Sequence, residues 1–131
     1  MRKYPLAQLF RALADPTRLR LINLIAEQEV CVCYFVEVLG APQPKISRHL
    51  AYLRGAGIVS ARRDGKWMHY KLVMPSDPAA AAIVRATVSS LKQDKDLQRD
   101  FHRLMKACCG PGLVQLSGAS LLKEKSGRAT Q

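Results

Sequence analysis

The chain has 131 residues, of which 21 are Lys or Arg and 10 are Asp or Glu, so its formal net charge is +11 at pH 7. This length predicts one domain with a modest core, and the basic excess favours a polyanionic partner, nucleic acid before an anionic membrane. No apolar run reaches 18 residues, which excludes a membrane-spanning helix. The first residues lack the apolar core of a signal peptide, so we expect a cytoplasmic protein.

Apolar residues at helical spacing predict the first three helices. The i, i+3, i+4, i+7 pattern of an amphipathic helix is met by Leu6, Leu9, Phe10 and Leu13. Asp15 then suits an N-cap and Pro16 a first helical position, so a largely buried helix should run from Pro16 to about Ala26. A short third helix is expected over residues 31–39, with Gly40 just after it.

The next helix, expected over residues 43–56, has two different faces. A narrow core-facing stripe at i, i+4, i+7 and i+11 consists of Ile46, Leu50, Leu53 and Gly57. About 120° round the helix axis lies a basic, hydrogen-bonding arc that consists of Lys45, Arg48, His49 and Tyr52. A short helix, a Gly/Pro turn and a polar-faced helix indicate a helix-turn-helix, whose second helix lies in the DNA major groove.

Residues 58–72 predict a β-hairpin. Asp64-Gly65 separates two β-prone runs, and a type I′ turn needs positive φ at both of its central residues. The tip is surrounded by Arg62, Arg63 and Lys66, which makes the hairpin the basic wing of a winged-helix protein. We therefore expect a mainly α winged helix-turn-helix with a β-hairpin wing, in the order α-α-α-α-β-β-α(α).

Asp77 caps the last helical region, whose apolar positions continue to Cys108. The polar stretch KQDKD at 92–96 interrupts them, so this region is one bent helix or two helices. The folded, DNA-binding domain should comprise residues 1–109. Residues 110–131 are rich in Gly and Ser and are expected to form a disordered tail.

The four cysteines form two close pairs, Cys31 with Cys33 and Cys108 with Cys109. Such clusters in a reducing compartment bind metal or perform redox chemistry more often than they form a disulfide framework. Thiolates select thiophilic ions, and a helix N-terminus lowers the pKa of a thiol. On an ideal helix, positions i and i+2 lie about 200° apart, so one ion would bind Cys31 and Cys33 only if the first helical turn distorted. We expect that distortion to act as a switch, which weakens DNA binding when an ion binds both sulfurs.

Cys108 continues an apolar stripe and has packing as its alternative role.

The candidate DNA-binding residues fall into two groups. Base edges should be read by Gln43 and Arg48, because amide and guanidinium groups pair bidentately with adenine and guanine. Phosphates should be bound by Lys45, Ser47, Tyr52, Arg62, Arg63 and Lys66. His49 contacts either DNA or a neighbouring helix. A solvated charged face is a better explanation than a zinc site for the group Asp94, Asp96, Asp100 and His102.

These features together resemble the ArsR/SmtB family of winged-helix metalloregulators, and within it the arsenical-resistance operon repressors with a CxC thiol pair. The resemblance covers about residues 4–92 and rests on ALADPTRLRLINLI at 12–25, EVCVC at 29–33, QPKISRHLAYLRGAGIV at 43–59 and RRDGKWMHYKL at 62–72. It implies a homodimer, built from the first and last helices, that represses its own operon from a palindromic operator. It also implies release from the DNA when As(III) or Sb(III) binds the cysteines.

Two positions depart from that family's pattern. Val36 stands where such arsenic sensors have a third cysteine, and Pro42 stands where the recognition helix usually has a Ser or Thr cap. Three arrangements stay open for the ion: the first thiol pair completed by a small thiol or hydroxide, a third sulfur from Cys108 or Cys109, or a separate site at that second pair. Trivalent organic arsenicals such as methylarsenite need two sulfurs only.

Two other functions compete with the arsenic-responsive repressor. A winged-helix repressor would sense Cd²⁺, Pb²⁺ or redox state through the same thiols. A thiol enzyme would use them for disulfide exchange or arsenate reduction, but the sequence lacks a phosphate-cradling loop.

Overall fold

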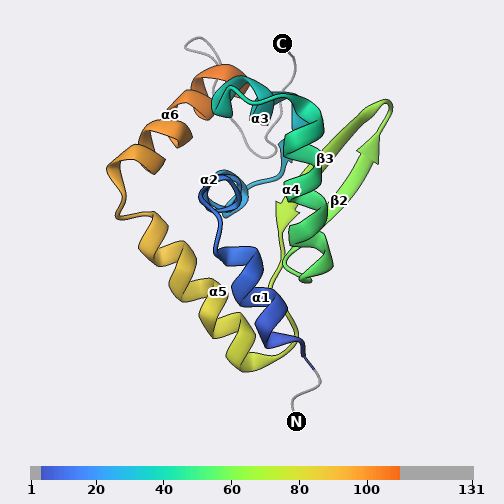
Figure 1. The fold of residues 1–131 in the computed structure, drawn as a ribbon. Helices are drawn as coiled ribbons and strands as arrows, with labels where there is room; N and C mark the ends of the chain where they lie inside the picture. The colour runs from blue at the N-terminus through green and yellow to red at the C-terminus, as the bar shows by residue number, and fades with distance from the viewer. Residues whose placement is uncertain (1–3, 110–131) are drawn as a thin grey trace.

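The computed structural model describes residues 4–109 of the chain. Its helices and strands, in chain order, are α1 (Leu6–Leu13), α2 (Pro16–Ile25), β1 (Val30–Cys31), α3 (Val32–Leu39), α4 (Gln43–Gly55), β2 (Val59–Asp64), β3 (Trp67–Leu72), α5 (Pro78–Leu91) and α6 (Lys95–Cys109). Figure 1 shows α2 in the middle of the helices and the β2–β3 hairpin projecting to one side. The predicted winged helix-turn-helix is confirmed, and the last helical region is two helices. The tail predicted for residues 110–131 lies outside the described range.

Local sequence signals set the helix boundaries. Asp15 accepts a hydrogen bond from the backbone N–H of Arg18 (3.0 Å) and Asp77 accepts one from that of Ala80 (2.9 Å), each just before a proline. Gly40 ends α3 with φ of +66°, a conformation that favours glycine. Pro42 precedes α4 in an extended conformation without a side-chain cap, so this helix begins at Gln43 even though the usual Ser or Thr is absent.

One strand was not predicted. Val30–Cys31 forms β1, which pairs antiparallel with β3 in a three-stranded sheet of order β1–β3–β2. A strand of two residues is too short for an alternating pattern to be visible in the sequence. This strand matters because it joins the segment that carries the thiols to the wing.

The roles predicted for two glycines are each shifted by one residue in the structure: the position of Gly65 in the hairpin turn and that of Gly57 in the buried stripe of α4. The hairpin turn consists of Gly65 and Lys66, because Asp64 pairs with Trp67 across the strands. The positive φ of Gly65, +63°, serves the first central position of the turn. Gly57 is exposed with φ of +81°, and the buried stripe of α4 is completed by Ala56.

The core surrounds α2, which contacts α1, α4, α5 and α6. Burial of one large apolar side chain contributes about 1.5–3 kcal/mol, so the stripe of α4 is enough to hold that helix against α2 with its other face outward. The fully buried residues include Leu9 of α1, Leu21, Ile22, Leu24 and Ile25 of α2, Phe35 of α3, Ile46, Leu50 and Leu53 of α4, and Leu104 of α6. Within residues 4–109, no helix combines the length and the apolar character that a membrane span requires.

A buried ionic contact joins α6 to α2 and α3. The carboxylate of Asp100, which is 5% exposed, accepts hydrogen bonds from Arg20 (2.7 and 3.0 Å) and Arg103 (2.9 Å). Arg103 also donates to the carbonyl oxygen of Val38, at the end of α3 (2.7 Å). The assignment of Asp100 to a solvated face is therefore wrong, since its carboxylate lies where three helices meet.

We expect Asp100→Ala to lower the free energy of unfolding by about 2–3 kcal/mol, because it leaves two guanidinium groups without their acceptor. The loss should stay below that of a fully buried pair because both arginines are partly exposed. Asp96→Ala on the same helix is the matched control, since it removes an exposed ion pair with Arg99. Urea denaturation measures both, and equal small losses would contradict the structural role of Asp100.

Candidate functional site

The first thiol pair lies at the junction of β1 and α3. The sulfur atoms of Cys31 and Cys33 are 3.2 Å apart, with Cys31 buried and Cys33 half-buried. Cys31 is the N-cap of α3 and has an extended backbone, with φ of −71° and ψ of 142°. The expectation that the helix must unwind to bring the sulfurs together is therefore wrong. The first cysteine is already outside the helix, so the helical angle between i and i+2 does not apply.

The two thiols differ in acidity. The S–H of Cys33 donates to the sulfur of Cys31, and this hydrogen bond lowers the pKa of Cys31 to about 7, assisted by the backbone N–H groups of Val32 and Cys33 and opposed by burial. The same hydrogen bond and burial raise the pKa of Cys33. One thiolate is thus available near neutral pH, and a soft ion that binds both sulfurs must displace the second proton.

Within the described part of the chain, this pair is not joined by a third candidate ligand. Among residues 4–109, no three His, Cys, Asp or Glu side chains are placed together to hold a metal ion. Val36, where the family resemblance calls for a thiol, packs against the core from α3. Cys108 also packs against the core from α6, which contacts α3. The side chain of Cys109 lies outside what the structure describes.

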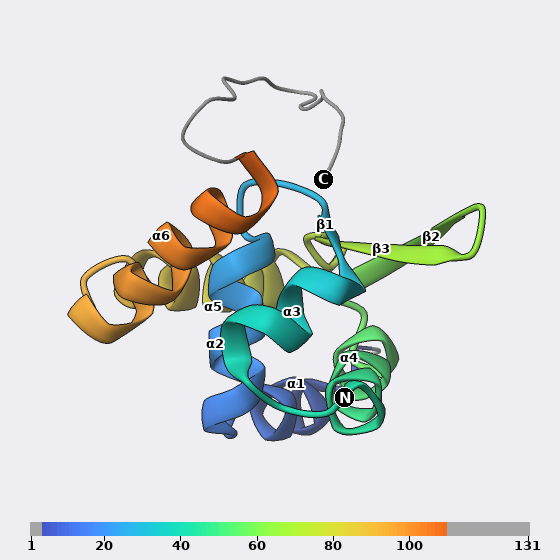
Figure 2. The ribbon, with the colours of Figure 1, turned by 90° about the horizontal axis from the view of Figure 1, so that it is seen from above.

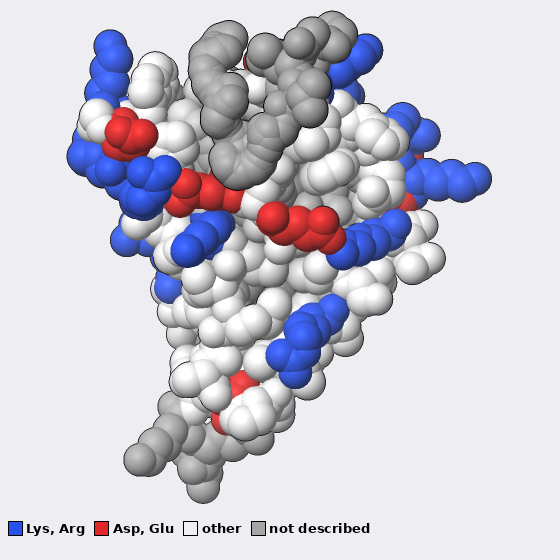
Figure 3. Space-filling view, turned by 180° about the vertical axis from the view of Figure 1, so that it is seen from behind, with Lys and Arg blue, Asp and Glu red and all other residues white. Residues whose placement is uncertain are grey.

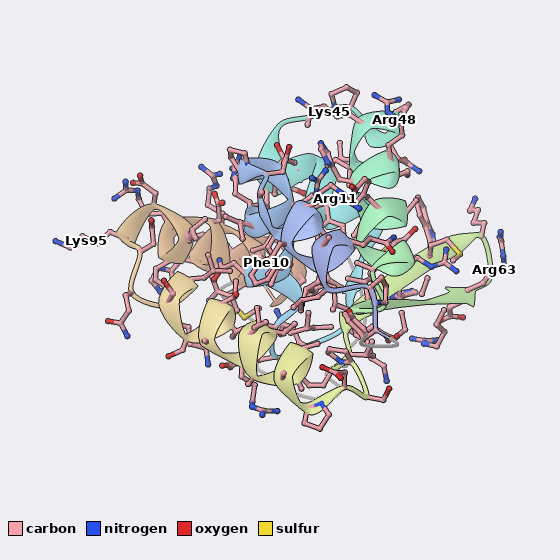
Figure 4. The ribbon with its side chains drawn as sticks, turned by 60° about the horizontal axis from the view of Figure 1, so that its bottom comes forward. Phe10, Arg11, Lys45, Arg48, Arg63 and Lys95 are labelled. Atoms are coloured by element: carbon pink, nitrogen blue, oxygen red, sulfur yellow. The ribbon has the colours of Figure 1, made fainter. Side chains whose placement is uncertain are left out.

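Most of the predicted reading residues lie on two protruding elements. Gln43, Lys45 and Arg48 are exposed at the start of α4, with Ser47 half-buried between them. Figure 4 shows Lys45 and Arg48 projecting from that end of α4 and Arg63 projecting from the wing. Figure 3 shows that basic side chains also gather on both upper sides of the back of the molecule. The net charge therefore does not locate the interface by itself, and the projecting start of α4 and the wing remain the predicted DNA-binding surface.

Arg18 of α2 holds α4 in place and engages two predicted reading residues. Its Nη1 lies 3.2 Å from Nδ1 of His49, and its guanidinium lies over the ring of Tyr52, 4.3 Å from the centroid. Its Nε and Nη2 donate to the carbonyl oxygens of Ala12 and Arg11 (2.8 and 2.9 Å) at the end of α1. His49 therefore contacts the neighbouring helix α2, one of the two roles predicted for it, while Tyr52 remains 38% exposed.

The pairing with Arg18 makes His49 a source of pH-dependent stability. Burial, together with the charges of Arg18, Lys45 and Arg48, lowers the pKa of His49 against the opposing effect of Asp15. Because an arginine only donates, the Nδ1 atom of His49 must be the unprotonated acceptor. The folded state thus favours the neutral ring, and its contribution is present above the ordinary pKa of 6.5 and is lost as the pH falls toward the lowered value.

We expect the wild-type protein to lose more unfolding free energy between about pH 7.5 and 5 than the His49→Gln variant, which has no proton to take up. Urea denaturation at several pH values measures this difference. Parallel stability curves for the two proteins would contradict it.

Arg62 of the wing forms an ion pair within the protein. Its Nε and Nη2 donate to the two carboxylate oxygens of Glu29 (3.1 and 2.6 Å), just before β1. Arg63 and Lys66, near the wing tip, are exposed and make no ion pair with any residue between 4 and 109. All three wing cations were predicted to bind phosphates, but Arg62 is already paired with a carboxylate in the free protein, whereas Arg63 and Lys66 have no ion pair with residues 4–109.

Residues 15–61, which contain the thiol pair and helix α4, match the sequence model of the bacterial regulatory protein arsR family. The chain is also 47% identical over 103 residues to the arsenical resistance operon repressor of Escherichia coli (strain K12), a match that covers 78% of this chain and 86% of that protein. The chain belongs to the arsR family.

Two further comparisons agree with the arsR assignment. The arsenic resistance transcriptional regulator ArsR1 of Pseudomonas putida is 55% identical over 65 residues, which cover 49% of this chain and 51% of that protein. The crystal structure of the transcriptional repressor BigR from Xylella fastidiosa matches with a TM-score of 0.53 at 34% identity, covering 65% of this chain and 84% of that one. Membership of the arsR family makes the protein a DNA-binding transcriptional regulator rather than an enzyme, and it confirms the family predicted from sequence.

Proposed function

We propose that this arsR-family protein is an arsenic-responsive repressor that binds operator DNA as a homodimer and dissociates when a trivalent arsenical or antimonite binds Cys31 and Cys33. The observation that carries this proposal is the 3.2 Å separation of the two sulfur atoms directly before α3 and the reading helix α4. The names of the E. coli and P. putida relatives support arsenic as the inducing element.

The position of the pair provides a route from the ion to the DNA. Cys31 belongs to β1, which pairs with the wing strand β3, whereas Cys33 belongs to the first turn of α3, which contacts α4. An ion bound to both sulfurs would therefore fix β1, which pairs with the wing strand β3, relative to α3, which contacts α4. The shape selected by the ion would fit the operator poorly. Couplings of about 1–3 kcal/mol are typical of such switches and correspond to roughly 5–150-fold in affinity.

The ligand set favours inducers that need two protein sulfurs. The pair alone, completed by a hydroxide, a small thiol or the organic group of methylarsenite, suits a site without a third converging donor among residues 4–109. Cys108 packs against the core from α6 and does not form a group of three candidate ligands with Cys31 and Cys33. We therefore favour the pair over the three-sulfur arrangement.

The homodimer is supported by the exposed apolar surface of α1. Phe10 is 51% exposed, although it occupies an apolar position of an amphipathic helix, and Figure 4 shows it on the face of α1 turned to the viewer. A second copy would cover this side chain in a two-fold arrangement, and two reading helices would then meet a palindromic operator.

The test is the release of a fluorescent duplex that carries the promoter of the protein's own operon, followed by anisotropy. As(III), Sb(III), methylarsenite, Cd²⁺, Pb²⁺, Zn²⁺ and peroxide are titrated in parallel, and we expect release by the trivalent arsenicals and antimonite. Release by Cd²⁺, Pb²⁺ or peroxide without release by any trivalent arsenical would favour the alternative sensor and overturn the proposal.

A further inference from the structure

Glu29 holds Arg62 in a geometry that DNA phosphate would also offer. The two hydrogen bonds of 3.1 and 2.6 Å join two guanidinium nitrogens to both carboxylate oxygens, a bidentate arrangement. Asp64 lies farther from the same guanidinium, at 3.9 Å. Carboxylates and phosphates present similar paired acceptors to arginine, so Arg62 engages one or the other.

The strand register places this ion pair next to the thiols. Cys31 lies opposite His69 across β1 and β3, and Arg62 lies opposite His69 across β2 and β3. Residues directly opposite one another in antiparallel strands point to the same face of a sheet, so Cys31, His69 and Arg62 share a face. Glu29 lies two residues before Cys31, and its carboxylate reaches Arg62. Figure 2 shows β1 leading into α3 beside the base of the wing, with the wing extending away from the helices.

We infer that Glu29 is an internal competitor of DNA phosphate for Arg62, and that it links the thiol strand to the wing. This inference rests on the proposed function. When the operator binds, Arg62 must leave Glu29 to reach a phosphate. When an arsenical bridges Cys31 and Cys33, β1 is fixed and Glu29 stays beside the wing, which favours the competing ion pair. The exposed wing cations Arg63 and Lys66 have no such competitor among the described residues.

The test is a double-mutant cycle on operator affinity. Glu29→Gln should raise the affinity of the inducer-free protein roughly two- to fivefold, the range that an exposed ion pair supports. In an Arg62→Gln background, the same change should have little effect, because no guanidinium is left to release. With methylarsenite bound, Glu29→Gln should retain more of its operator affinity than the wild type does, by a similar factor.

Glu27→Gln is the matched control for the removal of one negative charge. Glu27 lies two residues before Glu29 and forms its ion pair with Lys92, just after α5, rather than with the wing. An equal rise in affinity for both glutamine variants, or a rise that persists without Arg62, would mean that general electrostatics explain the effect, and the inference would fail. In either case the wild type would still bind and release the operator. A wild type that does neither would overturn the proposed function instead. Urea denaturation of each variant shows that the comparison is between folded proteins.

Discussion

The Cys31→Ser, Cys33→Ser variant should bind the operator as the wild type does and should remain bound in the presence of As(III) or methylarsenite. Serine keeps the size and a hydrogen-bonding group at both positions but provides no soft ligand. The whole inducer effect, roughly 5–150-fold in operator affinity, should therefore disappear. Anisotropy titration of labelled operator at saturating arsenical measures this loss, and circular dichroism verifies the fold.

Cys108→Ser provides the control for this experiment and decides the ligand set. This residue packs against the core from α6, so its replacement leaves both sulfurs at β1 and α3 in place. We expect release by As(III) and by methylarsenite to persist. Loss of release by As(III) alone would show that a third sulfur from α6 completes the inorganic site. Release by either arsenical from the double serine variant would refute the proposed thiol switch.

Operator affinity should fall steeply with salt, by roughly 10³–10⁵ between 50 and 200 mM if six to ten phosphates are bound. Lys45→Gln at the start of α4 should reduce the slope of log affinity against log salt by about 1 for each protomer, since one phosphate contact per protomer is lost. Fluorescence anisotropy over a salt series gives the slope.

Lys95→Gln is the charge-matched control. Lys95 is exposed at the start of α6, away from α4 and the wing, as Figure 4 shows. This variant should weaken binding little and leave the slope as it is. A nearly flat salt response of the wild type, or equal slopes for the two lysine variants, would show that the start of α4 is not the phosphate-binding surface.

Much of the fold could be predicted because its signals are local. The caps at Asp15 and Asp77, the positive-φ Gly40, and the apolar stripe of α4 act through neighbours within a few residues, which any reader of the sequence can count. The same locality placed the basic tip of the wing and brought Gln43, Lys45 and Arg48 to the exposed start of one helix. These predictions needed no knowledge of how the elements pack.

The contacts that organise the candidate site lie far apart in the sequence. Arg18 reaches His49, Arg62 reaches Glu29, and Arg20 reaches Asp100, over separations of 31, 33 and 80 residues. Helical periodicity indicates which way a side chain faces but not which partner it meets, so an arginine that holds two helices together looks like any other exposed cation. For this reason the sequence could not choose between DNA and a neighbouring helix for His49, and it did not indicate that Arg62 has a partner within the protein.

The sequence by itself predicted a basic winged-helix protein with a thiol pair just before α4, because composition, periodicity and motif spacing are properties of the chain itself, and its motifs resemble the ArsR/SmtB family. Only the tertiary structure decided how that pair is connected. Cys31 lies outside the helix because its backbone pairs with the wing strand β3, so the two sulfurs already lie 3.2 Å apart, and the ion that we propose they bind would link the wing to the helix-turn-helix. Strand pairing between residues nearly forty positions apart has no counterpart in local spacing, which is why the physical route from ion to DNA had to be seen in three dimensions.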